Sequence, residues 1–142
     1  MICAVQVRAD LAGRALSPTM VAALVDHALR HHLPQVIAPL RPTLKHRYPL
    51  TPIGEYVGWT RDDGQPFDPW VRSLTRLGAE VIGVEDASQV FTGSVAQWEE
   101  WSGLRLPTTG SYIVPDALAP LSIDCETDTG ICREPGIWVR QR

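Results

Sequence analysis

The chain lacks a long apolar segment, a block of basic residues and a signal-peptide pattern. No apolar run approaches the roughly 20 residues that span a bilayer. The N-terminus has no charged region followed by a long apolar stretch, so no signal peptide is indicated. The formal net charge is −3, and no block rich in Lys and Arg offsets it. These absences argue against membrane association and nucleic-acid partners, and they favour a cytoplasmic protein.

Cysteine is also scarce. The three cysteines, Cys3, Cys125 and Cys132, are too few and too scattered for a disulfide framework, so reduced thiols are favoured. Cys125 and Cys132 can face each other across a hairpin, which leaves a disulfide between them open as the second interpretation.

No metal site is predicted. Three histidines, His27, His31 and His32, lie near the end of the first expected helix, and His27 and His31 share one face of it. No carboxylate or cysteine is grouped with them. We therefore expect solvated imidazoles close to the negative end of the helix dipole.

What is present is the composition of a globular domain. The chain has 142 residues, of which 44% are hydrophobic and 20% are charged. That length is enough for one domain with a core of its own. No internal repeat or low-complexity run is present. We therefore expect a single domain over residues 1–142.

The most informative segment is an N-terminal strand–turn–helix pattern. The apolar run from Ile2 to Val7 predicts a short strand, and a turn containing Gly13 follows. Ser17 and Pro18 suit the N-cap and the first position of a helix. Free N–H groups at a helix N-terminus bind anions, so the turn is a candidate site for a cofactor phosphate. It is not a P-loop, because no Gly-Lys-Ser/Thr follows.

The rest of the chain mixes helix and strand signals, which predicts an α/β (α+β, mixed-sheet) fold. The first strand, the helix after it and the strand at 35–40 suggest a parallel β-α-β unit. Asp68-Pro69 begins a helix, and Ser94 with Gln97 forms a capping box that opens another. Thr129-Gly130 is the expected turn of a hairpin. Further strands are expected at residues 81–84, 111–114, 121–125 and 137–140, and a helix at 52–59.

Residues 12–17, the helix after them and the strand at 36–40 resemble the acyl-CoA-binding core of the GNAT superfamily of N-acetyltransferases. The family pattern there is Gln/Arg, two residues, Gly/Ala, one residue, Gly/Ala. Ala12 replaces the Gln/Arg, Ala15 satisfies the next position, and Ser17 stands where Gly or Ala is usual. The resemblance to actinobacterial-type members continues in residues 41–52, 98–101 and 112–115.

This resemblance implies a partial GNAT-like β-α-β core at residues 1–48. A helical segment and an antiparallel β-rich tail would follow at residues 49–142. Acetyl-CoA, or another acyl-CoA, would be the co-substrate. Tyr48, seven residues after Arg41, would protonate the departing CoA thiolate. Cofactor contacts are implied for the strand residues Val5 and Val7 and for the turn residues Gly13, Arg14, Ala15, Leu16 and Ser17.

The family's N-terminal half is absent, because Met1 falls at the start of the cofactor-binding strand. An unpaired apolar edge at residues 2–7 needs a neighbour, so we expect a homodimer or a complementing chain that carries the missing half. The spacing selects no general base among Glu55, Asp68 and His46.

The favoured function is acyl transfer to a small-molecule amine. Two alternatives stay open: a non-catalytic module that binds CoA or another subunit, and a GNAT-like fold that catalyses another small-molecule reaction.

Overall fold

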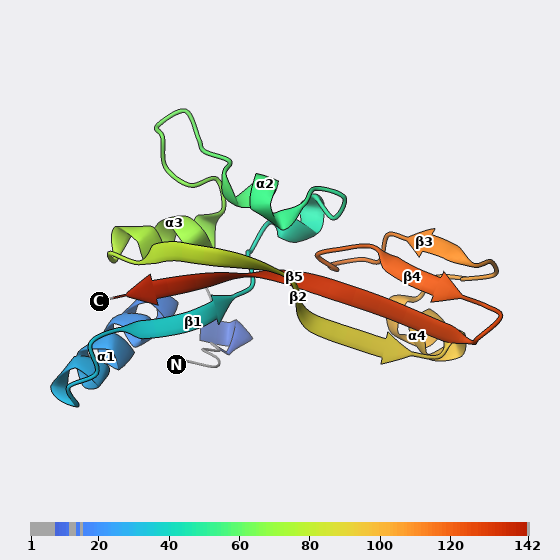
Figure 1. The fold of residues 1–142 in the computed structure, drawn as a ribbon, viewed down its shortest axis with the longest axis horizontal. Coiled ribbons are helices and arrows are strands. Elements are labelled where there is room, and N and C mark those ends of the chain that lie inside the picture. Colours follow the sequence, from blue (N-terminus) through green and yellow to red (C-terminus); the bar gives the residue numbers. More distant parts are fainter. Residues whose placement is uncertain (1–7, 12–13, 15, 142) are drawn as a thin grey trace.

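Two long antiparallel strands form the spine of the structure (Figure 1). β2 (Glu80–Gly93) pairs with one edge of β5 (Thr129–Gln141). The opposite edge of β5 pairs with β1 (Val36–Leu40) near one end and with β4 (Leu121–Asp124) near the other. β3 (Gly110–Tyr112) pairs with β4. All of these described pairings are antiparallel.

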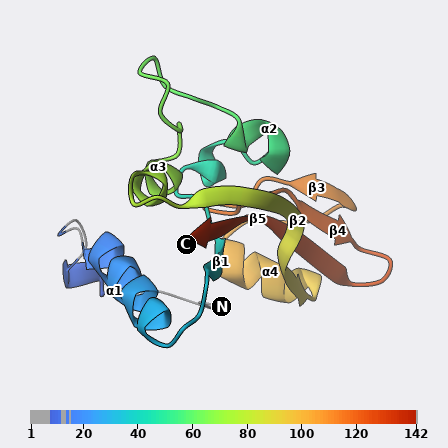
Figure 2. The same cartoon turned by 60° about the vertical axis from the view of Figure 1, so that its left-hand side comes forward.

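Helices are attached to both halves of this sheet. The computed structural model describes residues 8–11, 14 and 16–141, with helical elements η1 (Ala9–Leu11), α1 (Leu16–Arg30), η2 (Lys45–Arg47), α2 (Ile53–Val57), α3 (Pro69–Arg76) and α4 (Val95–Ser102). Figures 1 and 2 show α3 at one end of the β2–β5 pair and α4, with β3 and β4, at the other. None of the helices in the described ranges is long and apolar enough to cross a membrane.

Pro135 divides β5 into two halves. Glu85 lies opposite Gly136 and Gln89 lies opposite Glu134, so β2 bulges where it passes Pro135. Proline has no N–H to give to a strand ladder, and within sheets it is found at edges and bulges. The bulge marks the boundary between the two larger hydrophobic cores, which both include residues of β5.

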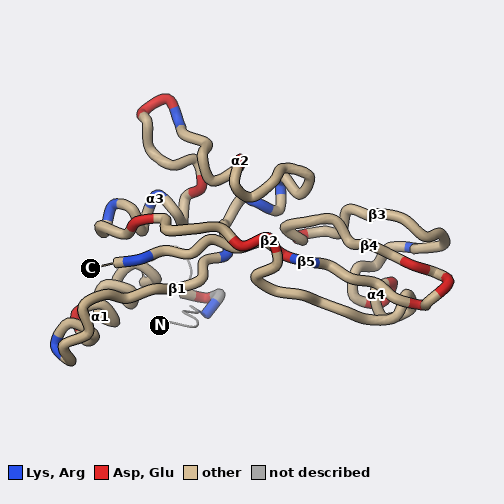
Figure 3. The backbone as a smooth tube through the Cα atoms, in the orientation of Figure 1, with Lys and Arg blue, Asp and Glu red and all other residues tan. Residues whose placement is uncertain are grey.

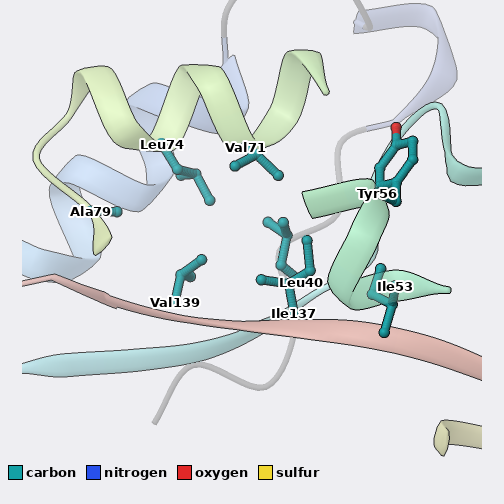
Figure 4. Close-up of a cluster of buried hydrophobic side chains, with 8 residues drawn as sticks. All are labelled: Leu40, Ile53, Tyr56, Val71, Leu74, Ala79, Ile137 and Val139. Atoms are coloured by element: carbon teal, nitrogen blue, oxygen red, sulfur yellow. The ribbon is translucent and has the colours of Figure 1, made fainter. Parts of the chain in front are cut away.

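The first core lies between the α2–α3 region and the strands β1 and β5 (Figure 4). Its buried residues are Leu40, Ile53, Tyr56, Val71, Leu74, Ala79, Ile137 and Val139.

The second core gathers around Trp98 of α4. The Trp98 indole N–H donates to the Gly130 carbonyl at 2.9 Å. A Cβ at Gly130 would lie 2.2 Å from Trp98 Cδ1, so this close approach requires glycine. The other buried residues are Leu106, Ala117, Leu121, Ile123 and Cys132.

The α+β class and the antiparallel, β-rich C-terminal part expected from the sequence are confirmed. The predicted cap of α3 is present, because the Asp68 carboxylate accepts the N–H groups of Trp70 and Val71. The predicted capping box of α4 is also present, with Ser94 and Gln97 each bonding the other's backbone N–H. β1 pairs with β5 antiparallel. The first strand of the expected parallel unit lies outside the described residues.

The predicted start of α1 was wrong by two residues. The helix begins at Leu16, so Ser17 and Pro18 lie inside its first turn instead of at the cap and the first position. N–H groups in a first turn have no intrahelical acceptor, so a proline is tolerated there and does not fix the boundary.

The predicted hairpin turn was also displaced. Residues 125–128 form the turn, while Thr129 and Gly130 are already paired with β4. Asp124 closes the turn by accepting the N–H groups of Glu126 and Thr127. A hydrogen bond from the Thr127 side chain, and then these two backbone hydrogen bonds, lower the pKa of the Asp124 carboxyl.

Candidate functional site

A cavity of about 330 Å³ lies between α1, β1, α3 and the middle of β5. Its walls are mainly apolar side chains of those elements. A few polar groups also reach it, among them Arg41, Ser88, Gln89, Glu134 and Gln141. An apolar cavity of this size with few polar groups is the common form of a small-molecule site.

Arg41 and Glu134 form an ion pair at this cavity. Arg41 Nε lies 3.1 Å from Glu134 Oε2, and Arg41 Nη2 lies 3.4 Å from Oε1. The Glu134 side chain is 10% exposed and the Arg41 side chain 50%. Figure 3 shows acidic and basic residues close together at the middle of the β2–β5 pair, where this ion pair lies.

The ion pair also holds the loop before β4. Arg41 Nη2 donates to the Asp116 carbonyl at 2.8 Å, and the Leu118 N–H donates to Glu134 Oε1 at 3.1 Å. The Leu118 carbonyl accepts from Lys45 Nζ at 2.8 Å. Both backbone groups of the fully buried Leu118 are therefore satisfied by side chains, those of Glu134 and Lys45.

Lys45 itself is almost fully buried, with 1% of the residue exposed. Its ammonium group donates to the carbonyls of Tyr48 and Leu118, and it lies 6.0 Å from the centre of the Tyr56 ring. Burial lowers the pKa of Lys45, because desolvation disfavours the charged form.

A second cavity, of about 240 Å³, lies on the α4 side of Glu134. Phe91, Trp98 and Trp101 supply aromatic rings to its lining, and Asp116 and Glu134 supply carboxylates. Glu134 therefore borders both cavities.

Cys132 also lines the second cavity. Burial, together with the negative charge of Glu134, raises the pKa of the Cys132 thiol to about 11. The thiol is therefore protonated at neutral pH and is a poor nucleophile. Cys125 and Cys132 are both free thiols, so the disulfide left open by the sequence is not formed.

Tyr48 lies just after η2, in an aromatic cluster. Its ring centre is 4.9 Å from that of Trp59, 5.8 Å from that of Phe67 and 6.0 Å from that of Tyr56. Its side chain is half-buried, and its carbonyl accepts from Lys45. No hydrogen bond within the described ranges engages its hydroxyl. Tyr48 is not among the described residues that line either cavity, and its role as proton donor stays a prediction.

The Asp68 carboxylate is engaged in hydrogen bonds that stabilise the fold. Its carboxylate accepts the Tyr56 hydroxyl at 2.8 Å and the Leu44 N–H at 2.9 Å, besides the two N–H groups of α3. Burial, and then the hydrogen bond to Asp68, raises the pKa of Tyr56 well above its usual range. Tyr56 is therefore a structural donor and not a source of protons at neutral pH.

The other two candidate bases also lie away from the cavities. His46 Nδ1 is 2.9 Å from the Thr43 carbonyl, and Glu55 is exposed on α2. None of Glu55, Asp68 and His46 lines either cavity. Glu134 lines both cavities, and no motif in the sequence pointed to it. The Glu-Pro-Gly run that breaks β5 was the available signal, since it marks a bulge between strand-like segments.

The predicted cofactor-binding residues are described only in part. Arg14 is exposed, and Leu16 and Ser17 are half-buried in the first turn of α1. Val5, Val7, Gly13 and Ala15 lie outside the described residues.

His27 in the last turn of α1 contacts His31, which follows the helix, with ring centres 4.4 Å apart. Across the part of the chain that the structure describes, no group of three or more His, Cys, Asp and Glu side chains is placed to hold a metal ion.

Comparison with known proteins finds similarity to an N-acetyltransferase. No protein-family model matches the chain. The chain is similar to the arginine N-acetyltransferase avaD of Aspergillus versicolor, at 28% identity. The alignment covers 87% of this chain and 49% of that protein. The chain therefore spans about half the length of this curated relative.

Proposed function

We propose that the chain is the acyl-CoA-binding part of an N-acetyltransferase that acetylates a small-molecule amine. Similarity to an N-acetyltransferase over 87% of the chain carries this proposal. The cavity beside β1 supports it, because Val21 and Val25 of α1 line that cavity, one to two turns after Leu16 and Ser17 in the first turn of the helix. Free N–H groups in the first turn of a helix favour a pyrophosphate.

In this reaction the acceptor nitrogen attacks the thioester carbonyl carbon directly. A C–N bond forms, the C–S bond breaks, and the nitrogen gives up a proton to water or a nearby base. The departing thiolate takes a proton from the Tyr48 hydroxyl, which makes no other hydrogen bond within the described ranges. No covalent intermediate on the protein is needed, in agreement with the protonated state of Cys132.

The binding step is tested by calorimetry with acetyl-CoA. We expect acetyl-CoA to bind and CoA to compete with it. Transfer is then measured by the release of CoA thiol, with arginine as the first acceptor because the relative's name specifies it. A chain that neither binds acetyl-CoA nor releases CoA would contradict the proposal.

Replacing Tyr48 with phenylalanine should lower kcat by about a hundredfold or more, since a positioned general acid contributes that much. The ring and its aromatic contacts remain, so the affinity for acetyl-CoA should not change. Tyr112→Phe is the matched control, because its hydroxyl bonds to Thr108 in the other half of the molecule. Equal rates for Tyr48→Phe and the parent would assign Tyr48 a packing role only.

A second segment of protein completes the acceptor site in this proposal. The chain spans 49% of its relative, and within the described ranges only β5 pairs with β1. We propose a second copy of the chain or a chain with the missing half as the neighbour, and light scattering distinguishes these assemblies from a monomer.

The alternative is a non-catalytic module, which the same half-length match favours. Binding of acetyl-CoA without transfer, even after the missing half of the relative is added, would select it.

A further inference from the structure

The boundary between the two cavities holds a carboxylate with spare capacity to accept hydrogen bonds. Glu134 is 7% exposed and borders both cavities. Its Oε1 accepts from Leu118 and Arg41, whereas its Oε2 accepts from Arg41 only among the described residues. Each carboxylate oxygen can accept two hydrogen bonds. One acceptor position on Oε2 is therefore unfilled by the residues that the structure describes.

The Glu134 carboxylate already binds a guanidinium group, that of Arg41. Arg41 contributes a guanidinium whose Nε and Nη2 face the two oxygens of Glu134. The Arg41 side chain is half exposed, and Glu134, although only 10% exposed, borders both cavities, so a dissolved cation reaches the carboxylate through a cavity. Such a cation can bind at the open position or displace Arg41 from the carboxylate.

The smaller cavity adds surfaces that attract a cation. Phe91 is 45% exposed and Trp101 is 57% exposed, so both rings are accessible in its lining. Aromatic faces bind ammonium and guanidinium groups. Asp116 is a second acidic residue in the lining, and it is exposed. A positively charged group in this cavity therefore meets negative charge and aromatic rings together.

We propose that Glu134 binds a positively charged group of the acceptor, so that the acceptor class is an amine with a second cationic group. The role of Glu134 in acceptor binding rests on the proposed acyl transfer, whereas cation binding itself is argued from the geometry around Glu134. Because Glu134 borders both cavities, a molecule anchored there through one cation can extend its amine into the larger cavity.

The test is calorimetry of the chain with two amino acids in the absence of any acyl-CoA. Arginine and citrulline have the same length and the same α-amine, but only arginine carries a guanidinium. We expect the parent chain to bind arginine about tenfold or more tightly than citrulline, as charge-assisted hydrogen bonds allow. Equal affinities would overturn the proposal. Failure of acetyl transfer alone would leave this result unaffected.

Two variants separate binding from structure. Glu134→Gln should abolish the preference for arginine. Arg41→Gln breaks the same ion pair but frees the carboxylate, so arginine should bind at least as tightly as to the parent. Equal losses of arginine affinity in both variants would show that the Arg41–Glu134 ion pair is purely structural and would overturn the proposal. Trp101→Leu removes an exposed ring and should weaken arginine binding several-fold without affecting citrulline. No change in Trp101→Leu would remove the aromatic wall from the site and overturn binding in the smaller cavity.

Discussion

Replacing Asp68 with alanine should lower the free energy of unfolding by about 3–5 kcal/mol, because the helix cap is lost and buried donors are left unpaired. Asp68 accepts four hydrogen bonds, from the N–H groups of Leu44, Trp70 and Val71 and from the Tyr56 hydroxyl. The residue is 3% exposed, so water cannot replace the missing acceptor. Urea denaturation of both proteins measures the difference.

Asp63→Ala is the matched control. Asp63 also accepts a backbone N–H, that of Gln65, but it is exposed, so the loss should stay below about 1 kcal/mol. Tyr56→Phe should fall between the two, at about 1 kcal/mol, because it removes one of the four hydrogen bonds. An Asp68→Ala protein as stable as Asp63→Ala would show that these bonds do not support the fold.

Replacing Lys45 with methionine should lower the free energy of unfolding by about 1–3 kcal/mol, since two carbonyls lose the ammonium donor and only the Tyr48 carbonyl keeps another donor, the Thr51 N–H. Those carbonyls belong to Tyr48 and Leu118, on opposite sides of the junction between the two cores. Methionine preserves most of the volume, so packing changes little. Arg47→Met, at an exposed cation two residues away, is the control and should change stability by less than about 0.5 kcal/mol.

Lys45 should also leave a signature in the pH dependence of stability. Burial lowers its folded-state pKa below the ordinary value of 10.5, so the folded chain releases this proton before the unfolded chain does. The parent should therefore gain stability relative to Lys45→Met as pH rises through that window toward 10.5. The neutral amine keeps two N–H groups, enough for both carbonyls. A constant difference across the window would contradict the lowered pKa.

The sequence predicted the parts of the fold that depend on near neighbours. Asp68 and Ser94 were identified as helix caps because a cap acts on N–H groups two or three residues along the chain. The class of the fold followed from the same local signals.

The length of β2 could not be predicted in this way. Only residues 81–84 were expected as strand, whereas β2 continues to Gly93. Most of its residues are exposed on both faces, so no alternation of apolar and polar residues marks the segment from Glu85 to Gln89. Pairing with β5 makes this segment a strand, and no local sequence pattern indicates that pairing.

The candidate site depends on contacts between distant residues. Arg41 and Glu134 are 93 positions apart, and Lys45 and Leu118 are 73 apart. A single sequence gives no spacing that links such positions. The sequence pattern singled out Arg41 and Tyr48, but Glu134, whose carboxylate borders both cavities, was identified only from the fold.

The central position of β5 sets the order in which the structure can form. β1 and β2 are synthesised long before β5, and within the described chain neither has another partner strand. During translation, neither core can therefore form until residues 129–141 leave the ribosome, and apolar strand surfaces stay uncovered until then. Pairing residue 36 with residue 141 closes a long loop, which slows folding. The nascent chain is thus exposed to premature association, and chaperone dependence should track the delay before β5 is complete.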